Sequence, residues 1–409
     1  MKRNILLIAL LCLSFRAKAQ SGPQPIVLGH IDTVYSEILK EKRPVWVYTP
    51  SFDTSYFTKP AYPVLYVLDG DGYFTSLVTM IQQLSAVNGN TVLPEMIIVG
   101  IPNTSGHRTR DLTPIASPSD KTSGGGENFT AFIEKELVPY IDKTYASAPY
   151  RTLMGHSLGG LLTINTLMKH TALFNAYVAL EPSMFYDNDN LLGQTKAILQ
   201  QKDFKGRTLF LGIANTMNPG MDTLQVRADT TIITHHIRSI LKLKDNLQKH
   251  PANHLRWDYK YYPDDDHASM PMIAAYDALR FIFQDNRFPR NQPQNQFFDK
   301  SLNAAQLEKM IKEHYQLLSK EMGYDVKPQE SNMNMFGYIF LQQKDYDRSG
   351  MFFKQNIDYY PGSFNAYDSM GDYYLAINNK SKAIEYFKKA LSIKYRQEIK
   401  DKLDKVLKQ

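Results

Sequence analysis

Ser157 is the residue with the clearest chemical potential in the chain. Residues 155–159 read Gly-His-Ser-Leu-Gly, the G-x-S-x-G pattern that places a serine hydroxyl on a sharp turn between a strand and a helix. Residues 151–154 can form a short buried strand, and the mostly apolar run 161–168 is typical of a helix. The glycines allow the close backbone approach that such a turn requires. We therefore predict that Ser157 is a nucleophile.

A serine hydroxyl is a weak nucleophile near neutral pH, so it needs a base within hydrogen-bond reach. Histidine suits this role because the pKa of an unperturbed imidazole lies near 6.5. In α/β-hydrolases the catalytic histidine follows the last strand of the sheet. Of the ten histidines, only His267 comes just after the last predicted strand, residues 255–262. We predict that His267 is the general base.

The acid of a Ser-His-Asp triad is expected in the loop after the predicted strand 207–213. Asp222 lies closer to the end of that strand and is the first choice. Asp229 is the alternative acid, although it is also placed to cap the helix that follows.

Two backbone N–H groups should face the oxyanion of the tetrahedral intermediate. Leu158, the residue after the nucleophile, supplies one of them. The glycine-rich turn 69–72, which follows the predicted strand 63–68, is expected to supply the other because its backbone can approach a ligand closely. Aromatic side chains near the site either stack an aromatic ring of the substrate or belong to the core. The pocket candidates are Tyr73, Phe185 and Tyr186.

A metal site is a second chemistry to consider, because His235 and His236 are adjacent and an acidic cluster occupies residues 264–266. Neighbouring residues on a helix point about 100° apart, however. No ligand spacing of a known metal motif is recognisable. The sequence therefore predicts no metal and no organic cofactor.

Strand-like and helix-like runs alternate through the first two thirds of the chain. This alternation predicts an α/β-hydrolase fold, with a mainly parallel central sheet and helices on both faces. Residues 20–42 are expected to form an extended lead-in. The predicted strands are 44–49, 63–68, 95–101, 151–154, 176–180, 207–213 and 255–262, and the main predicted helices are 73–84, 128–145, 161–168 and 234–249.

A 34-residue period marks the C-terminal part. Gly337 and Gly371 are separated by this interval, as are Phe353 and Phe387. Small and aromatic residues at that period are typical of tetratricopeptide (TPR) helix pairs. The predicted organisation is a signal peptide (1–19), a catalytic domain of α/β-hydrolase type (20–286), a linker and helix (287–330) and a small all-helical extension of TPR-like repeats (331–409). These repeats either bind a protein partner or are a helical appendage.

Residues 1–19 have the pattern of a cleaved secretory signal, with a basic start, an apolar run and Ala17-Lys18-Ala19 before Gln20. The single cysteine, Cys12, lies within this segment, so the mature chain is expected to lack disulfides and thiol chemistry. The formal charge of +6 falls to +2 once the four basic residues of the segment are removed. Such a charge gives no support for nucleic-acid binding. We expect a periplasmic or secreted protein without a membrane span after cleavage.

Five ordered motifs resemble the putative esterase family, which includes esterase D, ferric-siderophore esterases, feruloyl and acetyl-xylan esterases and mycolyltransferases. The resemblance covers roughly residues 25–285. It implies that Ser157 is the nucleophile, that His267 is the base and that Asp71 and Leu158 supply backbone oxyanion donors. The motifs are Leu-Asp-Gly-Asp-Gly at 68–72, Asn103 with Arg-Thr-Arg-Asp-Leu-Thr-Pro at 108–114, Gly-His-Ser-Leu-Gly-Gly at 155–160, Glu-Pro-Ser at 181–183 and Tyr-Pro at 262–263 before His267.

The chain departs from the family pattern at two places. Many relatives carry the acid, often a glutamate, near the position of Asn215, so a Ser–His dyad stays open. Phe185 and Tyr186 stand where relatives commonly have tryptophans, so the pocket on the acyl side is expected to differ.

The sequence predicts an exported serine carboxylic-ester hydrolase with an acyl-enzyme mechanism. Siderophore triesters and esterified polysaccharides are both candidate substrates. The alternative is a non-catalytic scaffold of hydrolase fold that binds a protein partner through the TPR-like repeats.

Overall fold

The computed structural model describes residues 25–251, 253–288 and 297–408. The predicted signal peptide, residues 1–19, lies outside the described residues. Among the helices of the described segments, none combines the length and the apolar character needed to cross a membrane.

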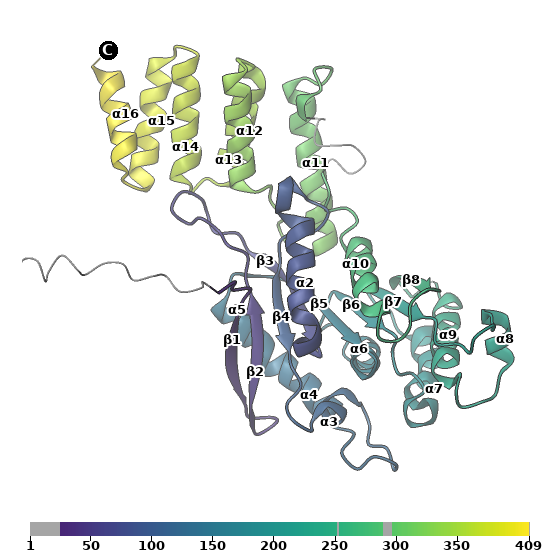
Figure 1. Cartoon of the computed structure of the whole chain (residues 1–409). Coiled ribbons are helices and arrows are strands. Elements are labelled where there is room, and N and C mark those ends of the chain that lie inside the picture. The colour runs from purple at the N-terminus through teal and green to yellow at the C-terminus, as the bar shows by residue number, and fades with distance from the viewer. Residues whose placement is uncertain (1–24, 252, 289–296, 409) are drawn as a thin grey trace, which may run out of the picture.

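An eight-stranded mixed sheet forms the centre of the larger part of the molecule (Figure 1), in the order β1-β2-β4-β3-β5-β6-β7-β8. The six strands from β4 to β8 in that order run parallel, whereas β1 and β2 are antiparallel to their neighbours. The predicted mainly parallel sheet is therefore confirmed. The strands are β1 (His30–Ser36), β2 (Glu41–Tyr48), β3 (Tyr62–Leu68), β4 (Ile97–Ile101), β5 (Ser147–His156), β6 (Ala176–Leu180), β7 (Thr208–Ala214) and β8 (Arg256–Tyr262).

The predicted extended lead-in was wrong in one respect, because part of it is the edge strand β1. This strand pairs with β2 in register from His30 opposite Val47 to Ser36 opposite Glu41. Only Val34 and Ser36 of its residues are buried, and Ile31 is exposed. An edge strand with so few buried apolar residues has little of the alternation that identifies strands in a sequence.

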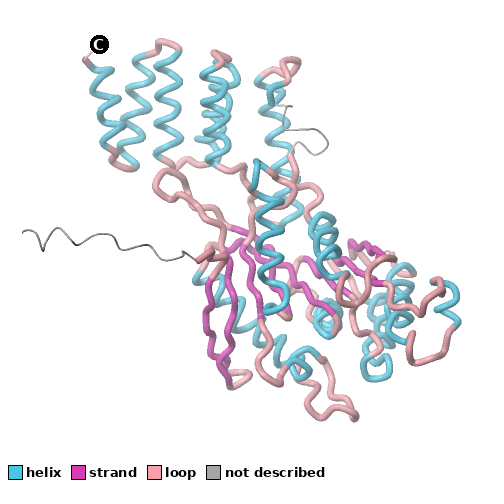
Figure 2. Tube along the Cα trace, viewed as in Figure 1, coloured by secondary structure: helices cyan, strands magenta, loops and turns pink. Residues whose placement is uncertain are grey.

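Helices cover both faces of the sheet (Figure 2). Alternate residues of β3 belong to opposite cores: Leu65 and Val67 contact the core under α2 and α10, and Tyr66 contacts the core on the other face. The helices of this part are α2 (Gly70–Ser85), η1 (Val87–Gly89), α3 (Arg108–Leu112), α4 (Gly126–Phe132), the π-helix η2 (Ile133–Leu137), α5 (Val138–Thr144), α6 (Leu158–Lys169), α7 (Tyr186–Gln201), α8 (Thr223–Ala228), α9 (His235–Gln248) and α10 (Met270–Ile282).

In the described part of the C-terminal region, six further helices form an array at one end of the molecule (Figure 1). A Cβ added to Gly337 would lie 2.4 Å from the Phe353 ring, and one added to Gly371 would lie 2.4 Å from the Phe387 ring. The 34-residue period therefore marks positions where one helix packs directly against a buried aromatic ring of the next. The helices are α11 (Ala304–Met322), α12 (Glu330–Gln342), α13 (Tyr346–Tyr359), α14 (Phe364–Ala376), α15 (Lys380–Ile393) and α16 (Gln397–Leu407).

The helical array contacts the sheet-containing part through the loop that joins β2 and β3 (Figure 1). The N–H of Thr58 donates to Glu330 Oε2 at 2.7 Å, and the Arg396 guanidinium lies 4.8 Å from the centre of the Tyr56 ring. Met322, at the end of α11, packs into the core under α2 and α10. The domain boundaries themselves stay a prediction.

Candidate active site

Ser157 occupies a strained turn between β5 and α6. Its φ of 58° and ψ of −117° lie outside the regions that non-glycine residues normally adopt. A Cβ on Gly155 would lie 2.2 Å from the carbonyl oxygen of Gly159, so only glycine fits there. The Ser157 N–H donates to the carbonyl of Leu180 at 3.0 Å, which ties the turn to the end of β6. The predicted strand, turn and helix around the serine are confirmed.

The register of the sheet brings a carboxylate close to this turn. His156 of β5 is opposite Leu180 of β6. The residues that follow them, Ser157 and Glu181, therefore lie at the ends of two neighbouring strands. Glu181 is fully buried and has a φ of 45°. Its N–H donates to the carbonyl of Gly212, and its Oε1 accepts the Ala214 N–H at 2.6 Å. The carboxylate is therefore held in a fixed orientation between β6 and β7.

The loop after β8 brings His267 to the same carboxylate. Asn215 fixes this loop, because its N–H donates to the carbonyl of Asp265 at 2.8 Å and its Nδ2 donates to the carbonyl of Pro263 at 2.9 Å. Nδ1 of His267 lies 3.4 Å from Glu181 Oε2. The His267 ring also packs on the ring of His156, with 4.4 Å between the ring centres. The imidazole thus lies beside the residue that directly precedes Ser157.

A second imidazole reaches Glu181 from the start of α9. Nε2 of His236 lies 3.1 Å from Glu181 Oε2. Burial alone would raise the pKa of Glu181. Its interactions with His236 and His267, together with the hydrogen bond from the Ala214 N–H, outweigh burial and lower the pKa of Glu181 below the usual value. The carboxylate is therefore ionised at neutral pH. Among the described residues, Glu181, His236 and His267 form a group of three side chains of types that can bind a metal, with one nitrogen or oxygen atom of each within 4.8 Å of those of the other two.

In the structure, the two aspartates predicted as the acid make hydrogen bonds elsewhere. Asp222 is the N-cap of α8, where its carboxylate accepts the N–H groups of Leu224 and Gln225. Asp229 accepts hydrogen bonds from Thr231 and Thr234 before α9. Among the contacts of the described residues, neither carboxylate has one with His267. The carboxylate that faces His267 directly follows β6, whereas the prediction placed the acid after the strand that is β7 in the structure.

Glu181 could have been predicted from the sequence as a residue of the site. It stands at the end of the predicted strand 176–180 and inside one of the five motifs. A carboxylate immediately after a buried strand, next to the strand of the nucleophile, is the pattern that would have identified it. His236 had no comparable pattern, because its partners belong to two other loops.

The two predicted oxyanion donors both lie in the first turn of a helix. Leu158 is the first residue of α6, and Asp71 is the second residue of α2. The first N–H groups of a helix have no intrahelical acceptor, and the helix dipole favours negative charge there. Asp69, the N-cap of α2, is fixed by Arg108, whose Nε and Nη2 contact its carboxylate at 2.6 and 2.9 Å. This ion pair holds the loop after β4 against the start of α2.

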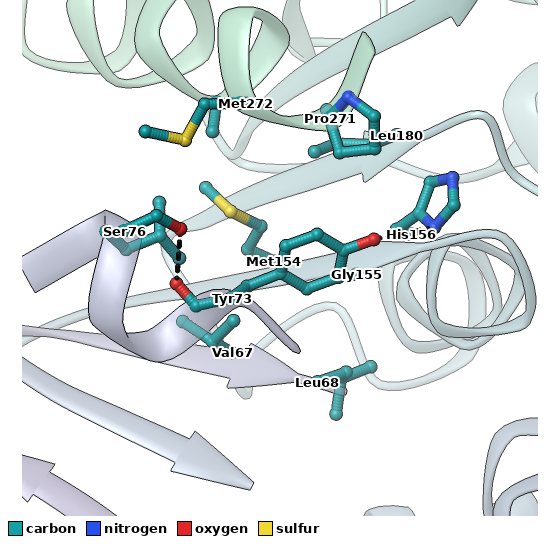
Figure 3. Close-up of a pocket in the computed structure, with 12 residues that line it drawn as sticks. Val67, Leu68, Tyr73, Ser76, Met154, Gly155, His156, Leu180, Pro271 and Met272 are labelled. Carbon is teal, nitrogen blue, oxygen red and sulfur yellow. Dashed lines mark hydrogen bonds between the residues drawn. The ribbon is translucent and has the colours of Figure 1, made fainter. Parts of the chain in front are cut away.

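Tyr73 and His156 both line a small cavity (Figure 3), together with Met154, Leu180 and Pro271. The Tyr73 hydroxyl lies 2.9 Å from Nδ1 of His156. The cavity of 10 Å³ has room for about one water molecule. Burial is the main reason that the pKa of His156 falls to about 4, so this imidazole is neutral at physiological pH.

The other two predicted pocket residues differ in their surroundings. The ring of Phe185 is 5.1 Å from that of His236 and is partly exposed, so it lies beside Glu181 and its imidazoles. The Tyr186 hydroxyl lies 3.4 Å from the carbonyl oxygen of Ile115, and its ring packs on the core. Phe185 is therefore the better placed of the two to contact a substrate.

Comparison with known proteins confirms the resemblance found from the motifs. Residues 36–207 match the model of the family described as "Putative esterase", and residues 364–396 match that of a tetratricopeptide repeat. The ferri-bacillibactin esterase BesA of Bacillus subtilis is 31% identical over 150 residues, which are 33% of this chain and 52% of BesA. The siderophore triacetylfusarinine C esterase of Aspergillus fumigatus is 26% identical over 34% of this chain and 50% of its own length. The chain spans about half the length of the curated relatives it matches.

A solved structure extends the likeness over most of the chain. An IroE-like serine hydrolase from Shewanella oneidensis superposes with a TM-score of 0.66 and 29% identity, covering 81% of this chain and 99% of that protein. The expected α/β-hydrolase fold and the TPR-like extension are both confirmed.

Proposed function

We propose that this protein is a serine esterase that hydrolyses carboxylic esters through an acyl-enzyme. The observation that carries the proposal is the contact of 3.4 Å between Glu181 Oε2 and His267 Nδ1, beside a serine held in a strained turn. A buried carboxylate on Nδ1 keeps a proton on that nitrogen and leaves Nε2 free to accept one. The matches to the esterase family and to a serine hydrolase structure support the same chemistry.

In the proposed mechanism, Ser157 Oγ attacks the ester carbonyl carbon while Nε2 of His267 takes the hydroxyl proton. Glu181 stabilises the imidazolium that forms, and the N–H groups of Leu158 and Asp71 stabilise the oxyanion. The imidazolium then donates its proton to the alcohol oxygen as the carbon–oxygen bond breaks. In the second half, His267 deprotonates a water molecule that attacks the acyl-enzyme and releases Ser157.

We further propose that siderophore esters are the substrate class. The support is that two relatives are named as esterases of ferri-bacillibactin and of triacetylfusarinine C. Phe185 beside the site offers a ring on which an aromatic group of the substrate can stack. A panel of catecholate and hydroxamate siderophore esters, run beside feruloyl and acetyl esters of polysaccharides, tests this point. A higher kcat/KM for the polysaccharide esters would indicate that glycan esters, and not siderophore esters, are the substrate class.

Export belongs to the same proposal. It is supported by the basic start, the apolar run and the Ala-Lys-Ala pattern of residues 1–19. Intact-mass measurement of the protein from a periplasmic or culture fraction should give an N-terminus at Gln20. A chain that keeps its first 19 residues in the cell extract would contradict this part.

The test of the esterase function is hydrolysis of an activated aryl ester by the full chain and by Ser157→Ala. We expect the substitution to reduce kcat by about 10⁶-fold, to the uncatalysed background of the assay, without changing the circular dichroism spectrum. His267→Asn should have a comparable effect. Retention of activity in Ser157→Ala would refute the proposed function.

A further inference from the structure

We propose that Glu181, His236 and His267 form a zinc-binding site, and that zinc bound there inhibits the enzyme. The binding of zinc depends on the geometry of these three side chains alone. The inhibition rests on the esterase function proposed above, in which His267 is the general base. The two parts are separable by experiment, because binding can be measured on a protein that lacks the nucleophile.

Two distances between ligand atoms are close to those around a tetrahedral ion. Zinc bonds to histidine nitrogen and carboxylate oxygen are about 2.0–2.2 Å long, which places two ligand atoms of a tetrahedron about 3.4 Å apart. Glu181 Oε2 lies 3.4 Å from His267 Nδ1 and 3.1 Å from His236 Nε2. All three ligand atoms lie within 4.8 Å of one another. Two histidines and one glutamate are also a donor set found in zinc enzymes, with the fourth position open to water.

The environment of His236 Nε2 is a second observation in favour of a ligand role for this nitrogen. This nitrogen is buried, and among the described residues it has no hydrogen-bond partner with acceptable geometry. Its distance of 3.1 Å to Glu181 Oε2 is short, but the oxygen does not lie in the direction required for a hydrogen bond. A ring nitrogen and a carboxylate oxygen that are close without pointing at each other are arranged like two ligands of one ion.

The three side chains are also held in place, so that little reorganisation would precede binding. Oε1 of Glu181 accepts the Ala214 N–H at 2.6 Å, which leaves Oε2 for the two imidazoles. The ring of Phe185 packs on His236 at 5.1 Å, and the ring of His156 packs on His267 at 4.4 Å. Such outer contacts orient metal ligands and contribute to affinity.

Zinc at this position removes the base that the serine needs. The ion takes the lone pair of His267 Nδ1, and the proton that was on Nδ1 leaves to Nε2 or to solvent. A neutral imidazole bound through Nδ1 carries its remaining proton on Nε2, so it has no lone pair there for the Ser157 proton. Glu181 is occupied at the same time and no longer stabilises an imidazolium. A chelator should reverse both effects.

The binding test uses tag-free full-length Ser157→Ala protein and zinc chloride alone, titrated in a calorimeter at pH 7.5. We expect one zinc ion per chain and, with Co²⁺ as a spectroscopic probe, the absorption of a tetrahedral complex. His236→Asn in the same background should weaken zinc binding by about 100-fold or more, since it removes a direct ligand.

His235→Asn is the matched control, because the neighbouring ring faces Asp189 at 2.8 Å and takes no part in the group. It should bind zinc as the parent does. The absence of stoichiometric zinc binding, or equal affinity in His236→Asn and His235→Asn, would overturn the site. Folding of each variant is checked by circular dichroism.

The inhibition test measures aryl-ester hydrolysis by the unmodified chain over a range of free zinc, with each variant normalised to its own rate without zinc. We expect inhibition that follows the calorimetric affinity, is reversed by a chelator and is shifted by about 100-fold in His236→Asn. If zinc binds to Ser157→Ala but the unmodified chain hydrolyses no ester, the proposed esterase function is wrong. The proposed zinc site is then still supported. If zinc binds without inhibiting, the inhibitory part is wrong.

Discussion

Glu181 and His267 are 86 residues apart in the chain, yet Oε2 of the first lies 3.4 Å from Nδ1 of the second. The contact joins the end of β6 to the loop after β8, across the end of β7. It makes Glu181 the proposed acid of the catalytic group, in place of the aspartates expected from the sequence.

Replacement of this carboxylate should therefore reduce the rate with little effect on binding. In Glu181→Gln the side-chain oxygen still accepts the Ala214 N–H, but the neutral amide neither fixes the His267 tautomer nor stabilises its imidazolium. We expect kcat for an activated aryl ester to fall by about 10³-fold or more. Steady-state kinetics of the purified variant measure this.

Asp222→Asn is the control for that experiment, because Asp222 caps α8. An asparagine also caps helices well, so kcat should stay within about twofold of the parent. A large loss in Asp222→Asn with little loss in Glu181→Gln would restore the original assignment of the acid.

The turn that carries Ser157 should not accept a side chain at Gly155. A Cβ there would lie 2.2 Å from the Gly159 carbonyl oxygen, which is backbone and has no freedom to move aside. We expect Gly155→Ala to destabilise the fold by about 3 kcal/mol. Chemical denaturation checks this against Gly193→Ala in α7, where nothing lies within 4 Å of the added carbon. Gly193→Ala should be neutral or slightly stabilising, and equal stability of the two variants would contradict the geometry of the turn.

Most of the fold was predictable because it depends on local patterns. The buried strands β3, β4 and β6 are continuous apolar runs between turn residues, and the elbow around Ser157 has a recognisable pentapeptide. The edge strand β1 was not predicted because it buries few apolar side chains.

The site was predictable only in part, because two of its contacts are set by the register between strands. Ser157 and His267 were predicted from their positions relative to predicted strands. The pairing of Glu181 with His267 depends on which strand end lies beside which, and His236 joins the group from the first turn of α9. His235, the neighbour of His236 in the sequence, contacts Asp189 and is not part of this group.

A charged cluster away from the site should make stability depend on pH. The hydrogen bond from Arg110 is the main cause that lowers the pKa of Glu41 to about 2, against the penalty of burial and with help from Arg43. A carboxyl group whose pKa is lower in the folded state stabilises the protein above its ordinary pKa near 4.5. This stabilisation, about 3 kcal/mol, is lost as the pH falls from about 4.5 to 2.

Urea unfolding at a series of pH values between 6 and 2.5 measures this loss. Glu41→Gln should be less stable than the parent at pH 6 and should show a flatter dependence on pH in the acid range. Parallel curves for the two proteins would show that Glu41 does not contribute.

The helical array should lose stability when its packing rings are removed, while the proposed active site remains intact. Phe387 is fully buried against Gly371, so Phe387→Ala should cost about 3–5 kcal/mol in this part of the molecule. Thermal circular dichroism should show the helical signal melting earlier, with kcat at 25 °C unchanged. Leu407→Ala, at an exposed position of α16, is the neutral control. A parallel loss of activity would mean that the two parts unfold as one unit.

The most direct test of the central claim is to label the folded protein with a fluorophosphonate and to locate the adduct by mass spectrometry of its peptides. We expect one adduct per chain, on Ser157, formed far more slowly in His267→Asn and absent from Ser157→Ala. An adduct on another serine, or no adduct in a folded and homogeneous preparation, would contradict it.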